Sequence, residues 1–191
     1  GSSALNYTTR GNYNTAIGAS GQAKLTTGNS NTSIGYQALY YNVTGNSNVV
    51  IGRGAAFGAN TKSNSNNVII GAAAAEVIQT SSLNVLIGVN SGSRITTGGS
   101  NIFIGANSGT RQTTLTNLLI IDNQARADVA TELSNAILYG VMAATPAAQT
   151  LRINAVTTIS PGYTAAGVNN VITLDATGSG ANGDGGSILL N

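Results

Sequence analysis

The sequence is dominated by a repeat in which Asn is followed three residues later by Ile and four residues later by Gly. Six copies are complete: Asn14 with Ile17, Asn31 with Ile34, Asn48 with Ile51, Asn67 with Ile70, Asn84 with Ile87, and Asn101 with Ile104. A seventh copy, Asn117 with Ile120, has Ile121 where the others have Gly. Successive asparagines are 17, 17, 19, 17, 17 and 16 residues apart, so the chain has a unit of about 17 residues.

A second column of identical residues supports the same register. Thirteen residues after each of the first six asparagines stands a threonine: Thr27, Thr44, Thr61, Thr80, Thr97 and Thr114. On this alignment the two extra residues of the 19-residue unit lie after Thr61.

A unit of 17 residues is too short for a pair of helices and suits one coil of a β-solenoid, with two short strands and two tight bends. Identical positions of stacked coils lie about 4.8 Å apart, so seven coils span roughly 30 Å. Ile packs on Ile in such a stack, and Asn and Thr form hydrogen-bonded ladders. Gly after the Ile permits a bend. We therefore expect an all-β fold in which the three columns are scaffold residues.

Composition agrees with this fold class and excludes several kinds of site. Only 7% of the residues are charged, against about a quarter in ordinary soluble proteins, yet 41% are hydrophobic. The chain has no Cys and no His, which excludes disulfides, histidine-based catalytic triads and the common zinc sites. The net charge is +2 and the arginines are scattered, so no basic stripe suggests nucleic-acid binding. No run of 18 apolar residues suggests a membrane span.

The strand of each unit has two apolar faces. Positions one and three after the Asn share a face, which we expect to be the coil's own core. Position two points the other way and reads Ala16, Ser33, Val50, Ile69, Leu86, Phe103 and Leu119. A thin solenoid has a single interior, so a second apolar face needs a partner. We expect Val50, Ile69, Leu86, Phe103 and Leu119 to form the interface of a homotrimer.

The repeated segments resemble two known groups of proteins. "NTAIGA" and "NTSIGY" are similar to strands of the left-handed β-roll in trimeric autotransporter adhesin heads (YadA-like). The longer "TGNSNTSIGYQALYYNVTGNSN" resembles repeats of phage tail-fibre proteins, and "LLIIDNQARADVATELSNAILYGVMAATPAAQTLRINA" resembles a segment that follows them. These resemblances cover about residues 12–154 and imply a trimeric, fibrous β-roll. The 17-residue period is longer than the autotransporter coil.

The pattern changes after the repeat. We expect residues 1–11 to be a tag remnant and lead-in, residues 12–121 a β-roll of about seven coils, and residues 122–156 a polar link with a β-meander neck. The polar stretch from Asp122 is expected to form a short helix or a wide loop, and 136–143 and 149–156 to be strands. Residues 157–191 look like the start of a second, Gly-rich fibrous element with strands at 171–174 and 187–190.

Catalytic and metal chemistry are weakly supported. Polysaccharide cleavage needs two carboxylates across a sugar, and the six available are Glu76, Asp122, Asp128, Glu132, Asp175 and Asp184. Glu76 stands alone on its coil and the others lie in the polar link or at strand ends, which favours solvated or capping roles, although a pair assembled across chains stays open. "GSGANGDGG" around Asp184 has one carboxylate, and a turn is favoured over a calcium site. We expect no catalytic residue, metal or cofactor.

Surface recognition has more candidates. Tyr36, Tyr40 and Tyr41 can stack on a sugar, or fill the roll's end or the trimer interface with Phe57. Arg94 and Arg111 occupy one repeat position and can meet an anionic glycan, or serve solubility. The Thr column lacks the T-x-T pattern of ice-binding solenoids.

Together these features predict a structural and adhesive segment of a phage tail fibre, located in the virion. It would hold or present a receptor-binding tip or touch the bacterial surface, with other fibre proteins and a cell-surface glycan or receptor as partners. The alternative is the head of a bacterial trimeric surface adhesin that binds host matrix or glycans. A polysaccharide-degrading spike is disfavoured because no nucleophile–base pair or metal cluster is visible.

Overall fold

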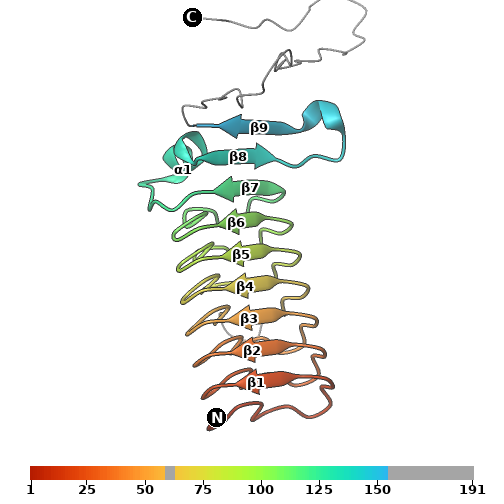
Figure 1. Cartoon of the computed structure of the whole chain (residues 1–191). Helices are drawn as coiled ribbons and strands as arrows, with labels where there is room; N and C mark the ends of the chain where they lie inside the picture. Colours follow the sequence, from red (N-terminus) through yellow and green to blue (C-terminus); the bar gives the residue numbers. More distant parts are fainter. Residues whose placement is uncertain (59–62, 155–191) are drawn as a thin grey trace, which may run out of the picture. The chain divides into compact units, whose positions relative to one another are not determined.

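A computed structural model describes residues 1–58 and 63–154, which form a β-solenoid (Figure 1). Its strands belong to one nine-stranded sheet in chain order. They are β1 (Thr15–Ile17), β2 (Thr32–Ile34), β3 (Val49–Ile51), β4 (Val68–Ile70), β5 (Val85–Ile87), β6 (Ile102–Ile104), β7 (Leu118–Ile121), β8 (Leu138–Val141) and β9 (Thr150–Ile153). Neighbours from β1 to β7 are parallel. The β-solenoid prediction is confirmed, but each described coil contributes one three-residue strand and not two.

The asparagines form a buried ladder beside the sheet. The backbone N–H of Asn31 donates to Oδ1 of Asn14 at 3.0 Å, and the Nδ2 of Asn31 donates to the carbonyl of Gly45 at 2.8 Å. The same backbone-to-Oδ1 bond recurs at every step, ending with the backbone N–H of Leu118 on Oδ1 of Asn101 at 3.0 Å. Each amide therefore satisfies backbone groups that the short strands leave unpaired, which is what buried polar groups require.

The coil's interior is lined by position two of the strand, so the predicted orientation of the faces is wrong. Val50, Ile69, Leu86 and Phe103 are all 0% exposed. Positions one and three, such as Val49 and Ile51, lie on the outside. The four buried residues cannot be an interface between copies, because they already pack inside their own chain; of the predicted interface residues, Leu119 is the one on the outer side.

A second inner column compensates the size of the first. The core column (Ala16, Ser33, Val50, Ile69, Leu86, Phe103) grows toward the C-terminus, while the residues six positions later shrink: Gln22, Leu39, Ala56, Ala75, Gly92 and Gly109. A Cβ on Gly109 would stand 2.5 Å from Cε2 of Phe103, and a Cβ on Gly92 would stand 3.2 Å from Cδ1 of Leu86. The glycines therefore make room for the largest core residues, and the coil keeps its thickness as the core changes.

This compensation predicts a strong coupling between two positions. Gly109→Ala should cost about 2–5 kcal/mol of unfolding free energy, from the left-handed backbone at φ +66° and from overpacking against Phe103. Phe103→Ile on top of it recreates the Ile69–Ala75 pair of an earlier coil, where Ala75 holds φ +50°. A urea-denaturation double-mutant cycle should show a favourable coupling of about 1 kcal/mol or more. Additive costs would contradict the packing described.

The seventh coil keeps the 17-residue period although its sequence motif slips by one. Strand pairing aligns Phe103 with Ile120 and Ile104 with Ile121. Leu118 takes the ladder position, and Asn117 takes the place of Ser100, with φ +59° against +58°. Asn117 is therefore outside the asparagine ladder, and Ile120 continues the core column and not the column of Ile104.

The threonine column needs one correction. Oγ1 of Thr44 lies 2.5 Å from Oγ of Ser63, so Ser63 is the residue in register and not Thr61. Thr61 lies outside the described residues, and the two extra residues precede Ser63 and do not follow Thr61. Thr27, Thr44, Thr80, Thr97 and Thr114 are exposed, and the Thr44–Ser63 contact is the one side-chain bond along this column within the described residues.

The first residues of the chain already follow the coil. The backbone N–H of Leu5 donates to the carbonyl of Gly21 at 3.1 Å, as Gln22 does to Ala38 at 3.0 Å one coil later. Ser3 and Leu5 have φ of +58° and +54°, the conformation of Ser20 and Gln22. The prediction of a tag remnant and lead-in for residues 1–11 missed this.

After β7 the sheet continues with antiparallel pairing, β7 to β8 and β8 to β9. The polar link contains α1 (Val129–Asn135), and a 3-10 turn, η1 (Pro146–Ala148), joins the last two strands. The predicted strands at 136–143 and 149–156 are therefore present in shorter form. The Gly-rich element predicted for 157–191 lies outside the described residues.

Candidate functional site

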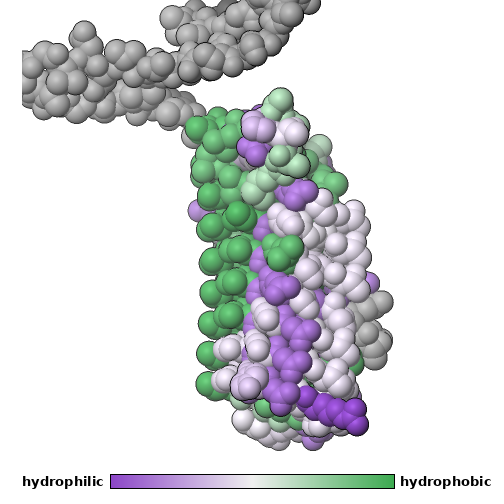
Figure 2. Space-filling view, turned by 90° about the vertical axis from the view of Figure 1, so that its right-hand side faces the viewer, coloured by the Kyte–Doolittle hydropathy of each residue, from purple (hydrophilic) through white to green (hydrophobic). Residues whose placement is uncertain are grey.

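The main candidate for function is the outer face of the sheet. It carries two straight columns of side chains. The valine column is Thr15, Thr32, Val49, Val68, Val85, Ile102, Leu119, Gly140 and Leu151, and the isoleucine column is Ile17, Ile34, Ile51, Ile70, Ile87, Ile104, Ile121, Leu138 and Ile153. In the space-filling view the hydrophobic residues form a continuous edge along the stack (Figure 2).

The outer face is exposed along its length and carries no charge. Ile17 is 56% exposed, Ile153 is 52% and Leu151 is 64%. Sixteen of the eighteen positions are apolar or glycine, and the other two are Thr15 and Thr32. Nine strands at about 4.8 Å spacing give the face a length of about 40 Å. A long, uncharged apolar face of this kind is typical of a surface that another macromolecule covers.

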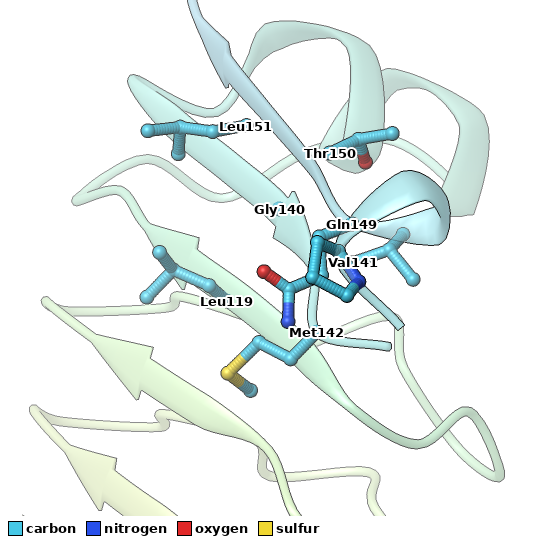
Figure 3. A pocket seen from close by; sticks show the side chains of 8 residues that line it. Leu119, Gly140, Val141, Met142, Gln149, Thr150 and Leu151 are labelled. Carbon is cyan, nitrogen blue, oxygen red and sulfur yellow. The ribbon is translucent and has the colours of Figure 1, made fainter. Parts of the chain in front are cut away.

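A groove opens on this face at the C-terminal end of the sheet. Leu119 and Leu151 point to the same side, and Gly140, paired with both, leaves a gap between them (Figure 3). We call this the C-terminal groove; its volume is about 620 Å³, and its lining is Leu119, Gly140, Val141, Met142, Pro146, Gln149, Thr150 and Leu151. β9 beyond it is exposed at all four residues. The groove is thus the hollowed end of the outer face.

The predicted aromatic site is partly assembled. The rings of Tyr40 and Phe57 stack at 5.3 Å, and Tyr41 meets Phe57 edge to face at 5.1 Å. Tyr36 is 52% exposed and is not among these ring contacts. Since the three clustered rings are half-buried against one another, they stabilise neighbouring coils, and the edges of Tyr40 and Tyr41 are what remains for a ligand.

The two arginines do not form a uniform stripe. Arg94 is exposed, whereas Nε of Arg111 donates to the carbonyl of Arg126 at 2.8 Å. Arg126 in turn binds the buried carboxylate of Asp122 at 2.7 Å. Arg111 therefore fixes the polar link against the last complete coil.

The remaining described carboxylates in the link are structural. Asp128 caps α1, and the hydrogen bonds that Thr131 donates hold the pKa of Asp128 below its usual range. Glu132 is buried and accepts from Nε2 of Gln112 at 2.7 Å and from the backbone N–H of Arg111 at 3.3 Å. In an earlier coil the N–H at this position, that of Val77, donates to the carbonyl of Ser93. The Glu132 carboxylate thus replaces the carbonyl of a further coil.

Burial raises the pKa of Glu132 above its usual 4.5. The folded chain then holds that proton more tightly than the unfolded chain, so the group's contribution to the unfolding free energy falls as pH rises from about 4.5 through the folded-state pKa. Glu132→Gln keeps one acceptor oxygen and should remove this fall. Urea denaturation between about pH 4 and pH 8 measures it; an unchanged pH slope in the variant would contradict the assignment.

Within the described residues no three His, Cys, Asp or Glu side chains are grouped to hold a metal ion. Glu76 is exposed, and Asp175 and Asp184 lie outside the described residues. No helix in the described part of the chain is long and apolar enough to cross a membrane. The sequence-predicted site residues are therefore scattered over several coils, and the site that reasoning from sequence missed is the outer face, because positions one and three were assigned to the core.

Comparison with known proteins leaves the candidate site to be judged on its own geometry. No protein-family model, no curated protein and no solved structure matches the chain.

Proposed function

We propose that the chain is a structural and adhesive segment of a phage tail fibre, in which three copies assemble through their outer faces. The observation that carries the proposal is the pair of apolar columns, which run uncharged over nine strands and are exposed in the single chain. Roughly 25 cal/mol is gained for each Å² of such surface removed from water, so the face favours association.

Three-fold closure suits this geometry. Copies related by rotation about an axis parallel to the stack present the same face inward and close on themselves, which keeps the assembly finite in cross-section. Left-handed coils and a neck formed by β8, β9 and α1 belong to the same proposal. The three necks then lie at one end, where other fibre proteins would attach.

The phage assignment rests on the resemblance of "TGNSNTSIGYQALYYNVTGNSN" and the link that follows it to tail-fibre repeats. It places the protein in the virion, outside the cell, where the repeat holds a receptor-binding tip or meets a cell-surface glycan. Tyr36, Tyr40, Tyr41 and Arg94 are the side chains available for that contact. A bacterial trimeric adhesin head is the second candidate, favoured by the x-A-I-G strand of the first coil, and an enzymatic spike is third.

Localisation separates the first two candidates. Antibodies raised against the chain should decorate the tail fibres of purified particles in electron micrographs. Decoration of intact bacterial cells that carry no phage would favour the adhesin instead. Release of reducing sugar ends from capsular polysaccharide by the purified chain would overturn the non-enzymatic assignment.

A further inference from the structure

The C-terminal groove is the place where the outer face is least complete. Gly140 leaves the valine column without a side chain between Leu119 and Leu151. A Cβ there would stand 2.9 Å from the carbonyl oxygen of Thr150 and 3.5 Å from Cβ of Leu119, so the chain has little room to fill the gap with a side chain of its own. An apolar hollow of about 620 Å³ therefore stays open in the single chain.

The surroundings of the groove need cover as well. Leu151 and Ile153 of β9 are 64% and 52% exposed on the same side of the sheet, and Ile137 is 47% exposed nearby in sequence. Large apolar residues and an apolar hollow thus occur together at one end of the sheet. At the other end the same face carries Thr15 and Thr32.

These features identify a second copy of this chain as the occupant. The outer face repeats every 4.8 Å or so for about 40 Å, and another copy is the partner that offers the same period, the same length and the same lack of charge. Parallel copies bring groove to leucine and threonine to threonine. Antiparallel copies would press Leu151 on Thr15, leaving a hydroxyl against apolar side chains, which is unfavourable.

We infer that the C-terminal groove is an intersubunit socket, closed by Leu138 and Ile153 of a second copy that stands parallel to the first and level with it. In an assembly around an axis parallel to the stack, the valine column of one copy faces the isoleucine column of the next. Gly140 and Leu138 belong to the same rung, so the missing side chain of one copy meets a large side chain of its neighbour. The inference rests on the proposed assembly through the outer face.

Short-range cross-linking tests it, because the chain has no cysteine of its own. Thr15→Cys places a thiol on β1 and Leu151→Cys places one on β9, both exposed on the outer face. A bismaleimide with a short spacer should join Leu151→Cys copies to each other and Thr15→Cys copies to each other. Co-expressed Thr15→Cys and size-tagged Leu151→Cys chains should give no mixed dimer. Arg94→Cys, exposed on the turn between β5 and β6, is the control and should not be joined.

The failures are distinguishable. Mixed dimers without the two like-with-like products would mean antiparallel copies and overturn the socket. An assembled protein in which Thr15→Cys is joined but Leu151→Cys is not would also overturn it and leave the assembly standing. Monomers by sedimentation with no product from any variant would overturn the assembly and the socket together.

Discussion

Gly35→Ala should unfold the solenoid or destabilise it by about 4 kcal/mol, from roughly 1–3 kcal/mol of backbone strain and roughly 1–3 kcal/mol of overpacking. Gly35 has φ +136°, and a Cβ there would stand 2.5 Å from the carbonyl oxygen and 2.7 Å from the carbonyl carbon of Gly52. Both neighbours are backbone atoms held by the next coil, so neither can move aside without breaking the stack.

The matched control is Gly54→Ala. Gly54 also has a positive φ, +65°, but a Cβ there has no heavy atom within 4 Å. This variant should lose about 1–2 kcal/mol, the ordinary cost of a left-handed non-glycine residue. Thermal and urea unfolding of the two variants measure the difference. Equal costs would mean that the glycine column is needed for its dihedral angle alone and not for the close approach of coils.

The second large effect separates two adjacent residues. Leu86→Asp should prevent folding, because Leu86 is 0% exposed and an unpaired carboxylate in the core cannot be solvated. Ile87→Asp should leave the coil folded, because Ile87 lies on the outer face. It should instead abolish assembly, since the charge would be buried between copies.

Circular dichroism reports folding and sedimentation reports assembly for the same two variants. The expected pattern is an unfolded or aggregated Leu86→Asp and a folded, monomeric Ile87→Asp. A folded, monomeric Leu86→Asp with an assembled Ile87→Asp would restore the opposite assignment of the faces, in which position two meets the partner.

Sequence alone determined the period and the solenoid, because the repeated Asn, Ile and Gly leave few other folds. It did not determine which strand face is the interior, because both Ile69 and its neighbours Val68 and Ile70 are apolar. The signal that does so is the size compensation between Phe103 and Gly109 and between Leu86 and Gly92, which requires the two positions to face each other inside one coil.

Other differences have local causes. The segment at Asn117 fits the motif in two registers one residue apart, and pairing of β6 with β7 selects the one that keeps the period. Tyr40, Tyr41 and Phe57 lie close in sequence on successive coils, so their contact follows from the repeat. The C-terminal groove depends on the antiparallel turn of β8 and β9, which breaks the repeat and cannot be read from it.

The central claim is that the outer face is covered by further copies of the chain. Sedimentation equilibrium of the unmodified protein tests it most directly. The account predicts a single species of three times 19.1 kDa that does not dissociate on moderate dilution. A soluble species of 19.1 kDa, stable with its nine-stranded apolar face open to water, would contradict it.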